Sequence, residues 1–282
     1  MPNEPSLPTP QWDGPLVFPP TSTEHTHTII LLQGHTGTTA SGLVSGRLES
    51  TFPSAKKRPT PAWSVRTFTR TWFDLYSLDD PSERDYTQIV GLEDTSRYLR
   101  SLIHAEATEL LQSGIPCESE GYDRIIVGGF GQGFAASIFA VLGGDGVPAG
   151  YIGLNGCKSF WSSHKGTVPP DDADPRSARR PRYLRFPART GPGWHPPNPS
   201  TGTLRTVDTQ IFRMPVFLGY RMDRRKGSMK LAADVEYVLK RGMGVDVTWK
   251  EYDMDSGDTK EVDDIIDFLS NKVGVPRAPT NN

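Results

Sequence analysis

Apolar residues along this chain follow two alternating spacings. Short apolar runs, typical of buried strands, end at polar or glycine-containing segments. Between them, apolar positions recur every three or four residues, as in amphipathic helices. We expect strands at 26–32, 63–68, 124–129, 150–154, 214–220 and 245–252. We expect helices at 85–113, 133–142, 228–241 and 260–272. The alternation predicts the α/β class, with a mainly parallel, doubly wound sheet and helices on both faces.

Two segments depart from this alternation. Residues 1–24 carry seven prolines and predict a disordered or extended arm. Residues 166–208 are rich in proline and arginine and are too long for an ordinary connection. They predict a loosely packed surface insertion, or alternatively a lid over the site or a basic docking patch. We therefore expect one α/β domain at 25–273, followed by a flexible tail at 274–282.

Composition limits the classes of partner and compartment. A formal net charge of −2 gives no electrostatic reason to expect nucleic acid as a partner. There is no apolar run long enough to span a membrane, and the first residues do not resemble a secretory signal. Cys117 and Cys157 are too few for a disulfide framework. These observations predict a cytoplasmic protein, and they contain no signal for an oligomeric state.

The most informative motif follows the strand at 124–129. The chain continues through Gly129, Phe130, Gly131, Gln132 and Gly133 into a helix that begins with small residues. A buried strand, a glycine-bounded turn and a helix form the context of a G-x-S-x-G nucleophile elbow. The residue at the tip is Gly131, which carries no nucleophile. The motif predicts a hydrolase scaffold without the serine on which hydrolysis depends.

Further motifs occur in order along the chain. They are Ile-Leu-Leu-Gln-Gly at 30–34, Thr-Trp-Phe-Asp at 71–74, Pro-Val-Phe-Leu-Gly at 215–219, and the tail segments 245–252 and 263–265. With the elbow, these segments resemble the acyl-protein thioesterase and carboxylesterase family of α/β hydrolases, especially its fungal branch. The resemblance covers about 26–160 and 214–270, and it implies the α/β-hydrolase fold.

The resemblance also implies a Ser-Asp-His triad, in that order, on loops at the carboxyl ends of the strands. The serine position falls on Gly131, the histidine position on about Gly257, and the acid on Asp223 to within one residue. The last histidine of the chain is His195. Losing the serine or the histidine of a triad lowers kcat by a factor on the order of 10⁶. We therefore expect no efficient ester hydrolysis.

Several remaining residues are candidates for other chemistry. The resemblance places oxyanion donors at the backbone amides of Gln132 and His35. The His35 imidazole can serve as an acid or base, or it can be a loop residue without a catalytic role. Arg221 can pair with Asp223 to bind a carboxylate or polarise a ketone, or the two can form a surface salt bridge. Gln33, Gly34 and Trp72 are candidates for substrate binding, although Gln33 can equally bond to backbone and Trp72 can equally serve packing.

Three hypotheses for function follow. The first is a non-hydrolytic pocket catalyst that promotes a cyclisation, condensation or elimination on a small hydrophobic or carbonyl-containing ligand. Small-molecule biosynthesis in fungi is a setting suggested by analogy alone. The second is a catalytically silent pseudo-hydrolase that binds or regulates a partner. The third is a weak residual carboxylic ester hydrolase. None of the three requires a metal ion or a cofactor.

Overall fold

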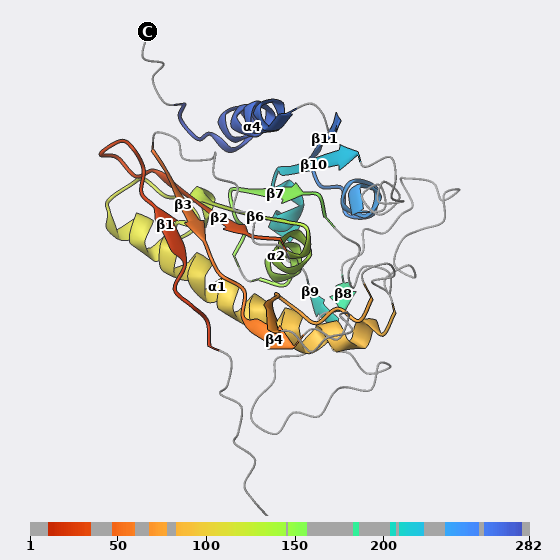
Figure 1. The fold of residues 1–282 in the computed structure, drawn as a ribbon. Coiled ribbons are helices and arrows are strands. Elements are labelled where there is room, and N and C mark those ends of the chain that lie inside the picture. Colours follow the sequence, from red (N-terminus) through yellow and green to blue (C-terminus); the bar gives the residue numbers. More distant parts are fainter. Residues whose placement is uncertain are drawn as a thin grey trace, which may run out of the picture.

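A seven-stranded sheet forms the centre of the molecule (Figure 1). The computed structural model describes residues 11–34, 47–59, 68–77, 83–144, 146–156, 183–185, 204–206, 209–222, 235–253 and 257–277. The strand order is β1-β3-β2-β6-β7-β10-β11. These strands are β1 (Leu16–Phe18), β2 (His27–Leu32), β3 (Leu48–Phe52), β6 (Ile125–Phe130), β7 (Gly150–Leu154), β10 (Val216–Met222) and β11 (Val247–Asp253). β1 runs antiparallel to β3, and every other neighbouring pair is parallel. The predicted mainly parallel α/β architecture is confirmed.

Helices cover both faces of this sheet. α1 (Gln88–Gln112) and α2 (Gln132–Leu142) lie on one face, and α4 (Gly257–Phe268) lies on the other (Figure 1). The shorter elements are β4 (Lys57–Pro59), β5 (Phe68–Arg70), η1 (Asp85–Thr87), η2 (Tyr122–Arg124), η4 (Thr209–Arg213), η5 (Val238–Gly242) and η6 (Leu269–Val273). Among the described residues, no helix is long and apolar enough to cross a membrane.

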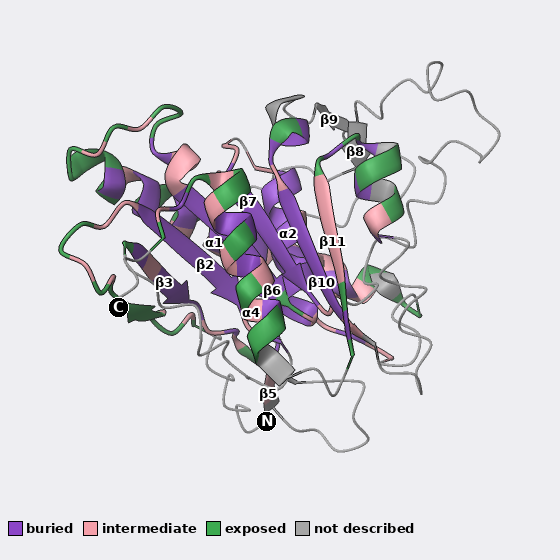
Figure 2. Cartoon of the chain, turned by 90° about the horizontal axis from the view of Figure 1, so that it is seen from above, coloured by how far each residue is buried: buried purple, intermediate pink, exposed green. Residues whose placement is uncertain are grey.

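The apolar run of β2 explains why it lies at the centre of the sheet. Its side chains alternate between the two faces, so Ile30 and Leu32 enter the core under α1 and α2. Ile29 and Leu31 enter the second core, under α4. Burying each such side chain contributes about 1.5–3 kcal/mol. Figure 2 shows the central strands as the most buried part of the chain. A strand covered on both faces therefore needs an unbroken apolar sequence.

Part of the arm predicted at 1–24 as disordered or extended forms a short strand, and residues 1–10 lie outside the described residues. Leu16–Phe18 form β1, in register with Ser50 to Phe52 of β3. The Phe18 ring also meets the Phe52 ring edge-on, at 5.7 Å between centroids. Pro15 and Pro19 flank this short strand. Backbone pairing with β3 orders the segment although its side chains stay exposed.

Two predicted elements lie only partly within the described residues. Of the strand expected at 63–68, only Phe68 is described, and it begins β5, which pairs with β4. Of the helix expected at 228–241, residues 235–241 are described, and they form the turns that end in η5. Within the insertion at 166–208, β8 (Tyr183–Arg185) pairs antiparallel with β9 (Leu204–Thr206). The lid and docking roles of this insertion stay predictions.

Candidate functional site

The turn between β6 and α2 has an unusual backbone conformation at its tip. Gly131 has φ 56° and ψ −114°, a region that residues with a side chain rarely adopt. Its N–H donates to the carbonyl oxygen of Leu154, at 2.9 Å. A Cβ added at Gly131 would lie 3.9 Å from Gly34 Cα and 4.0 Å from the Asn155 carbonyl oxygen. The strand-turn-helix geometry is therefore present, with room for a small side chain that glycine does not supply.

The flanking glycines bring two loops together at this tip. A Cβ at Gly133 would lie 2.3 Å from the carbonyl oxygen of Leu32, and one at Gly129 would lie 2.4 Å from the carbonyl carbon of Gly133. Both positions need glycine because backbone approaches backbone there. The close approach places the first turn of α2 against the end of β2. As a result, Gly34 lies beside Gly131, as expected for two members of one site.

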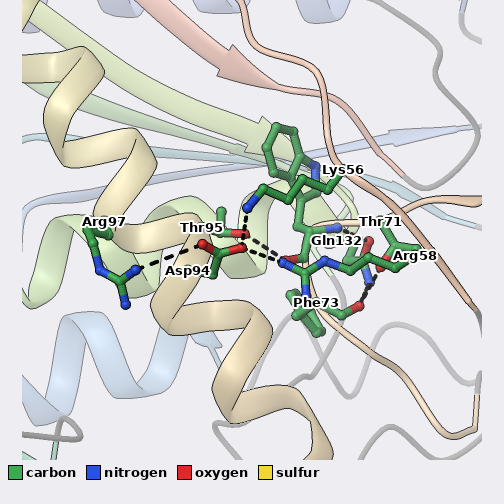
Figure 3. Close-up of polar contacts among 9 residues, drawn as sticks. Lys56, Arg58, Thr71, Phe73, Asp94, Thr95, Arg97 and Gln132 are labelled. Atoms are coloured by element: carbon green, nitrogen blue, oxygen red, sulfur yellow. Dashed lines mark hydrogen bonds and ion pairs between the residues drawn. The ribbon is translucent and has the colours of Figure 1, made fainter. Parts of the chain in front are cut away.

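The Gln132 side chain holds the segment that contains Trp72 and Phe73 (Figure 3). Its Oε1 accepts from the Trp72 backbone N–H at 3.1 Å, and its Nε2 donates to the Phe73 carbonyl oxygen at 2.9 Å. Only 6% of Gln132 is exposed. The side-chain amide therefore serves structure. The backbone N–H, in the first turn of α2, has no intrahelical acceptor and is the group that can face a ligand.

Trp72 in turn holds the loop after β2. Its indole Nε1–H donates to the Gln33 carbonyl oxygen at 2.7 Å, and its own carbonyl oxygen accepts from Thr95 Oγ1 at 2.6 Å. Only 1% of Trp72 is exposed, so the structure favours packing over ligand contact for this residue. Next to Thr95, Asp94 binds Lys56 and Arg58, each at 2.8 Å (Figure 3). This network fixes the backbone around Gln33 and Gly34.

Asn155, which sequence analysis missed, connects the elbow to β10. It has φ 44°, uncommon for a residue with a side chain. Its Oδ1 accepts from the Arg221 backbone N–H at 2.7 Å, while its carbonyl oxygen faces the tip at Gly131. The available signal was an Asn-Gly pair directly after a buried strand, because asparagine tolerates positive φ in such turns.

Arg221 forms an ion pair with a residue that the sequence did not suggest. Its Nε and a terminal guanidinium nitrogen donate to Glu261 Oε2, at 2.9 and 2.7 Å. Only 6% of Glu261 is exposed, and its Oε1 has no hydrogen-bond partner among the described residues. Gly257, the expected histidine position, is the first residue of α4, one turn before Glu261. The pair therefore joins the end of β10 to the start of α4.

Two predicted site residues lie outside the described residues. They are His35 and Asp223, so their roles as acid or base and as pairing carboxylate stay predictions. Within the described part, no group of histidine, cysteine and acidic residues has the arrangement of a metal site.

A small apolar cavity lies beside this end of the sheet. It measures about 10 Å³, about the room for one water-sized molecule. Its lining includes Phe134, Leu218, Tyr220, Val235 and Trp249. The Tyr220 and Trp249 rings stack with 6.2 Å between centroids. The pocket for a small hydrophobic or carbonyl-containing ligand, which the first functional hypothesis requires, stays a prediction.

Known proteins share both the sequence pattern and the fold. Acyl-protein thioesterase 1 of Neurospora crassa is 30% identical over 155 residues, which are 50% of this chain and 58% of that protein. The Cryptococcus neoformans protein of the same name is 36% identical over 141 residues, 46% of this chain and 54% of that protein. The chain thus spans little more than half the length of these two relatives. The Gibberella zeae protein of that name is 31% identical over 179 residues, 57% of this chain and 68% of that protein.

Solved structures agree with the fold. Acyl-protein thioesterase 2 of Zea mays superposes with a TM-score of 0.58 at 19% identity, covering 93% of this chain and all of that one. SOBER1 of Arabidopsis thaliana gives a TM-score of 0.54 at 17% identity, covering 88% of this chain and 99% of that one. The family described as phospholipase/carboxylesterase matches residues 19–168, which is more than half of the chain. With its ordered motifs, its parallel sheet and its elbow turn, this chain belongs to the phospholipase/carboxylesterase family of α/β hydrolases.

Proposed function

We propose that this family member has lost serine-hydrolase chemistry and uses the elbow as a non-hydrolytic site for a carbonyl-containing ligand. The observation that carries the proposal is Gly131, which stands at the tip with φ 56° and leaves the space for a side chain open. The segment 253–260, where the histidine of the triad is expected, contains no histidine. A triad without serine and histidine loses on the order of 10⁶ in kcat.

The retained elements suit a ligand carbonyl oxygen. The first N–H groups of α2, led by Gln132, lack intrahelical acceptors and carry the partial positive charge of a helix N-terminus. Such donors stabilise negative charge that develops on a carbonyl oxygen. In the proposed reaction, the His35 imidazole removes a proton from the carbon next to the carbonyl. The resulting enolate oxygen faces the Gln132 N–H, and elimination, cyclisation or condensation can proceed from that intermediate.

Loss of serine chemistry is tested with a fluorophosphonate probe, which labels activated serines, and with a panel of p-nitrophenyl esters. We expect no labelling and no turnover for the natural chain or for Gly131→Ser, because the histidine that activates the serine of a triad is missing at its expected position, Gly257. Gly131→Ser combined with Gly257→His is expected to gain weak labelling. Turnover by the natural chain that disappears in His35→Ala would instead establish a residual esterase.

The non-hydrolytic chemistry needs its own measurement. We expect the protein to exchange the α-hydrogens of S-hexanoyl-N-acetylcysteamine for deuterium, with the exchange lost in His35→Ala. Mass spectrometry of the recovered thioester follows the exchange. Saturable binding of this thioester without any exchange would support the silent binding protein instead.

A further inference from the structure

Trp12 lies in the proline-rich arm, yet its ring packs beside the candidate site. It stacks on Tyr98 of α1, with 4.1 Å between centroids and 8° between planes. It also stacks on Trp72, at 6.1 Å and 27°. Lys56 Nζ lies over the Trp12 ring, 4.4 Å from its centroid. The neighbouring Asp13 forms an ion pair with Arg70 of β5. The arm is thus held by side chains here and by backbone pairing in β1.

The contacts of Trp72 connect Trp12 to the elbow. The Trp72 indole N–H binds the Gln33 carbonyl oxygen at 2.7 Å, and its backbone N–H binds Gln132 at 3.1 Å. Gly34, the next residue after Gln33, lies 3.9 Å from the Cβ position of Gly131. Trp72 therefore connects the Trp12 ring to the loop that forms one wall of the site.

The other hydrogen bonds of Trp72 are made by its backbone. Thr95 binds its carbonyl oxygen at 2.6 Å, and Gln132 binds its N–H. Lys56, which covers Trp12, is itself held by Asp94 at 2.8 Å. These bonds hold the backbone of Trp72, whereas its ring is held by the indole bond to Gln33 and by packing in the core, which includes the Trp12 ring. The direction of the indole N–H depends on the ring.

We infer that Trp12 is a positioning residue for the candidate site. Its ring holds Trp72 in the orientation that binds the Gln33 carbonyl, and this sets where Gly34 stands relative to Gly131. The inference takes its ligand from the proposed function, but the positioning itself does not depend on that function. The arm, which sequence patterns separate from the domain, is then part of the site's support.

The test measures hydrogen exchange of the Trp72 indole N–H by NMR in protein labelled with ¹⁵N-tryptophan, assigned with Trp72→Phe. The Ile126 backbone amide of β6 reports on global opening. In Trp12→Ala we expect several-fold faster exchange of the Trp72 indole relative to Ile126. Trp12→Phe, which restores stacking, should return the rate close to that of the natural chain.

Phe18→Ala is the matched control, because Phe18 lies on the same arm and contacts Phe52 rather than Trp72. It should lower Tm without changing the exchange of the Trp72 indole relative to Ile126. If Trp12→Ala does not fold, Trp12→Leu keeps an apolar side chain and removes the aromatic stacking, and faster relative exchange is expected there as well. Exchange that rises only in parallel with Ile126 would overturn the inference and leave Trp12 a general stabiliser.

The thioester exchange reaction separates this inference from the proposed function. If both hold, Trp12→Ala slows deuterium incorporation while Phe18→Ala does not. If the natural chain catalyses no incorporation, the indole exchange still decides whether Trp12 positions the loop.

Discussion

At the scale of single residues, glycines of the same motif are required for different reasons. Gly131 supplies a backbone conformation that is strained for other residues, yet the space around it is open. Gly133 has no such conformational requirement, but a Cβ there would lie 2.3 Å from the Leu32 carbonyl oxygen. Gly131 is therefore required for its backbone conformation, and Gly133 is required because a side chain would clash with the neighbouring backbone.

Alanine substitutions separate these two needs. We expect Gly131→Ala to lower the free energy of unfolding by about 1–3 kcal/mol, the cost of a residue held in a sparsely populated region. Gly133→Ala should cost more, because backbone must move to admit the methyl group. Urea denaturation of both variants checks the order. Equal losses would mean that the elbow relaxes freely around either side chain.

At the site, local sequence motifs predict the elbow turn but not the contacts between residues far apart in the chain. The motif at 129–133 predicts the elbow because glycine spacing is a local signal, and the structure has the turn there. The partners of Trp72 are not predictable in this way. Trp12 is 60 positions away in the chain, and Gln132 is 60 away on the other side. Only the packed sheet brings them together.

At the scale of elements, the Arg221–Glu261 pair joins β10 to α4. In the implied triad, an aspartate and a histidine would link the loops that follow β10 and β11. In this chain, a guanidinium and a carboxylate join the end of β10 to the helix that follows β11. Glu261 is nearly inaccessible, whereas 27% of the Arg221 side chain is exposed. Removing Arg221 and removing the charge of Glu261 should therefore lower stability by different amounts.

We expect Arg221→Met to be more destabilising than Glu261→Gln. Removing Arg221 leaves a buried carboxylate without a counter-charge, with a loss of up to about 3 kcal/mol in the free energy of unfolding, the low end for a buried pair. Glu261→Gln leaves an arginine that can still donate to the amide oxygen and reach water. Thermal and urea unfolding measure both. A larger loss for Glu261→Gln would contradict this account.

Elements also differ in how well their sequence predicts them. β2 and β6 each contain an apolar run, at 29–32 and 125–127, and both strands form where expected. β3 was missed because its Ser50 and Thr51 are polar, although both are fully buried in the structure. β1 was missed because three residues between prolines carry no periodic signal. In both cases, tertiary pairing decides the structure and the local pattern does not.

At the scale of the whole molecule, buried titratable groups lie away from the elbow, at the start of β2 and on α1. Burial, with the nearby Glu49 and Glu109, raises the pKa of Glu106 to about 7, against a weaker opposing effect of a hydrogen bond from Thr28. Burial, with Arg124, lowers the pKa of His27 to about 4. The two groups make stability depend on pH in opposite directions.

The contribution of Glu106 to the free energy of unfolding is present in full below the ordinary glutamate pKa of 4.5. This contribution is lost as pH rises through about 7, because the unfolded chain gives up the proton more readily than the folded chain. Glu106→Gln removes a carboxyl group whose ionised form is disfavoured by burial in the folded chain. We therefore expect this variant to be more stable than the natural chain at about pH 8 and nearly equal to it at about pH 4. Urea midpoints at both pH values measure the difference. A difference that is the same at both pH values would show that Glu106 does not titrate as stated.

For His27, stability is lost as pH falls from 6.5 towards about 4, because the unfolded chain gains a proton that the folded chain does not. Once Glu106→Gln has removed the opposing trend, stability should rise steadily between about pH 4 and pH 6.5. A profile of unfolding midpoints across that range tests this. A flat profile would mean that His27 takes up its proton as readily in the folded protein as in the unfolded chain.

The short strand β1 also bears on how copies of the protein meet one another. It covers the outer edge of β3, which would otherwise present free N–H and C=O groups to other chains. The side chains of β1 are apolar and exposed. The strand is only three residues long, however, and Pro15 and Pro19 flank it. Proline has no N–H to donate, so strand addition cannot extend past either end. The same prolines that favour an unstructured arm in the sequence thus limit edge-to-edge pairing at this edge of the sheet.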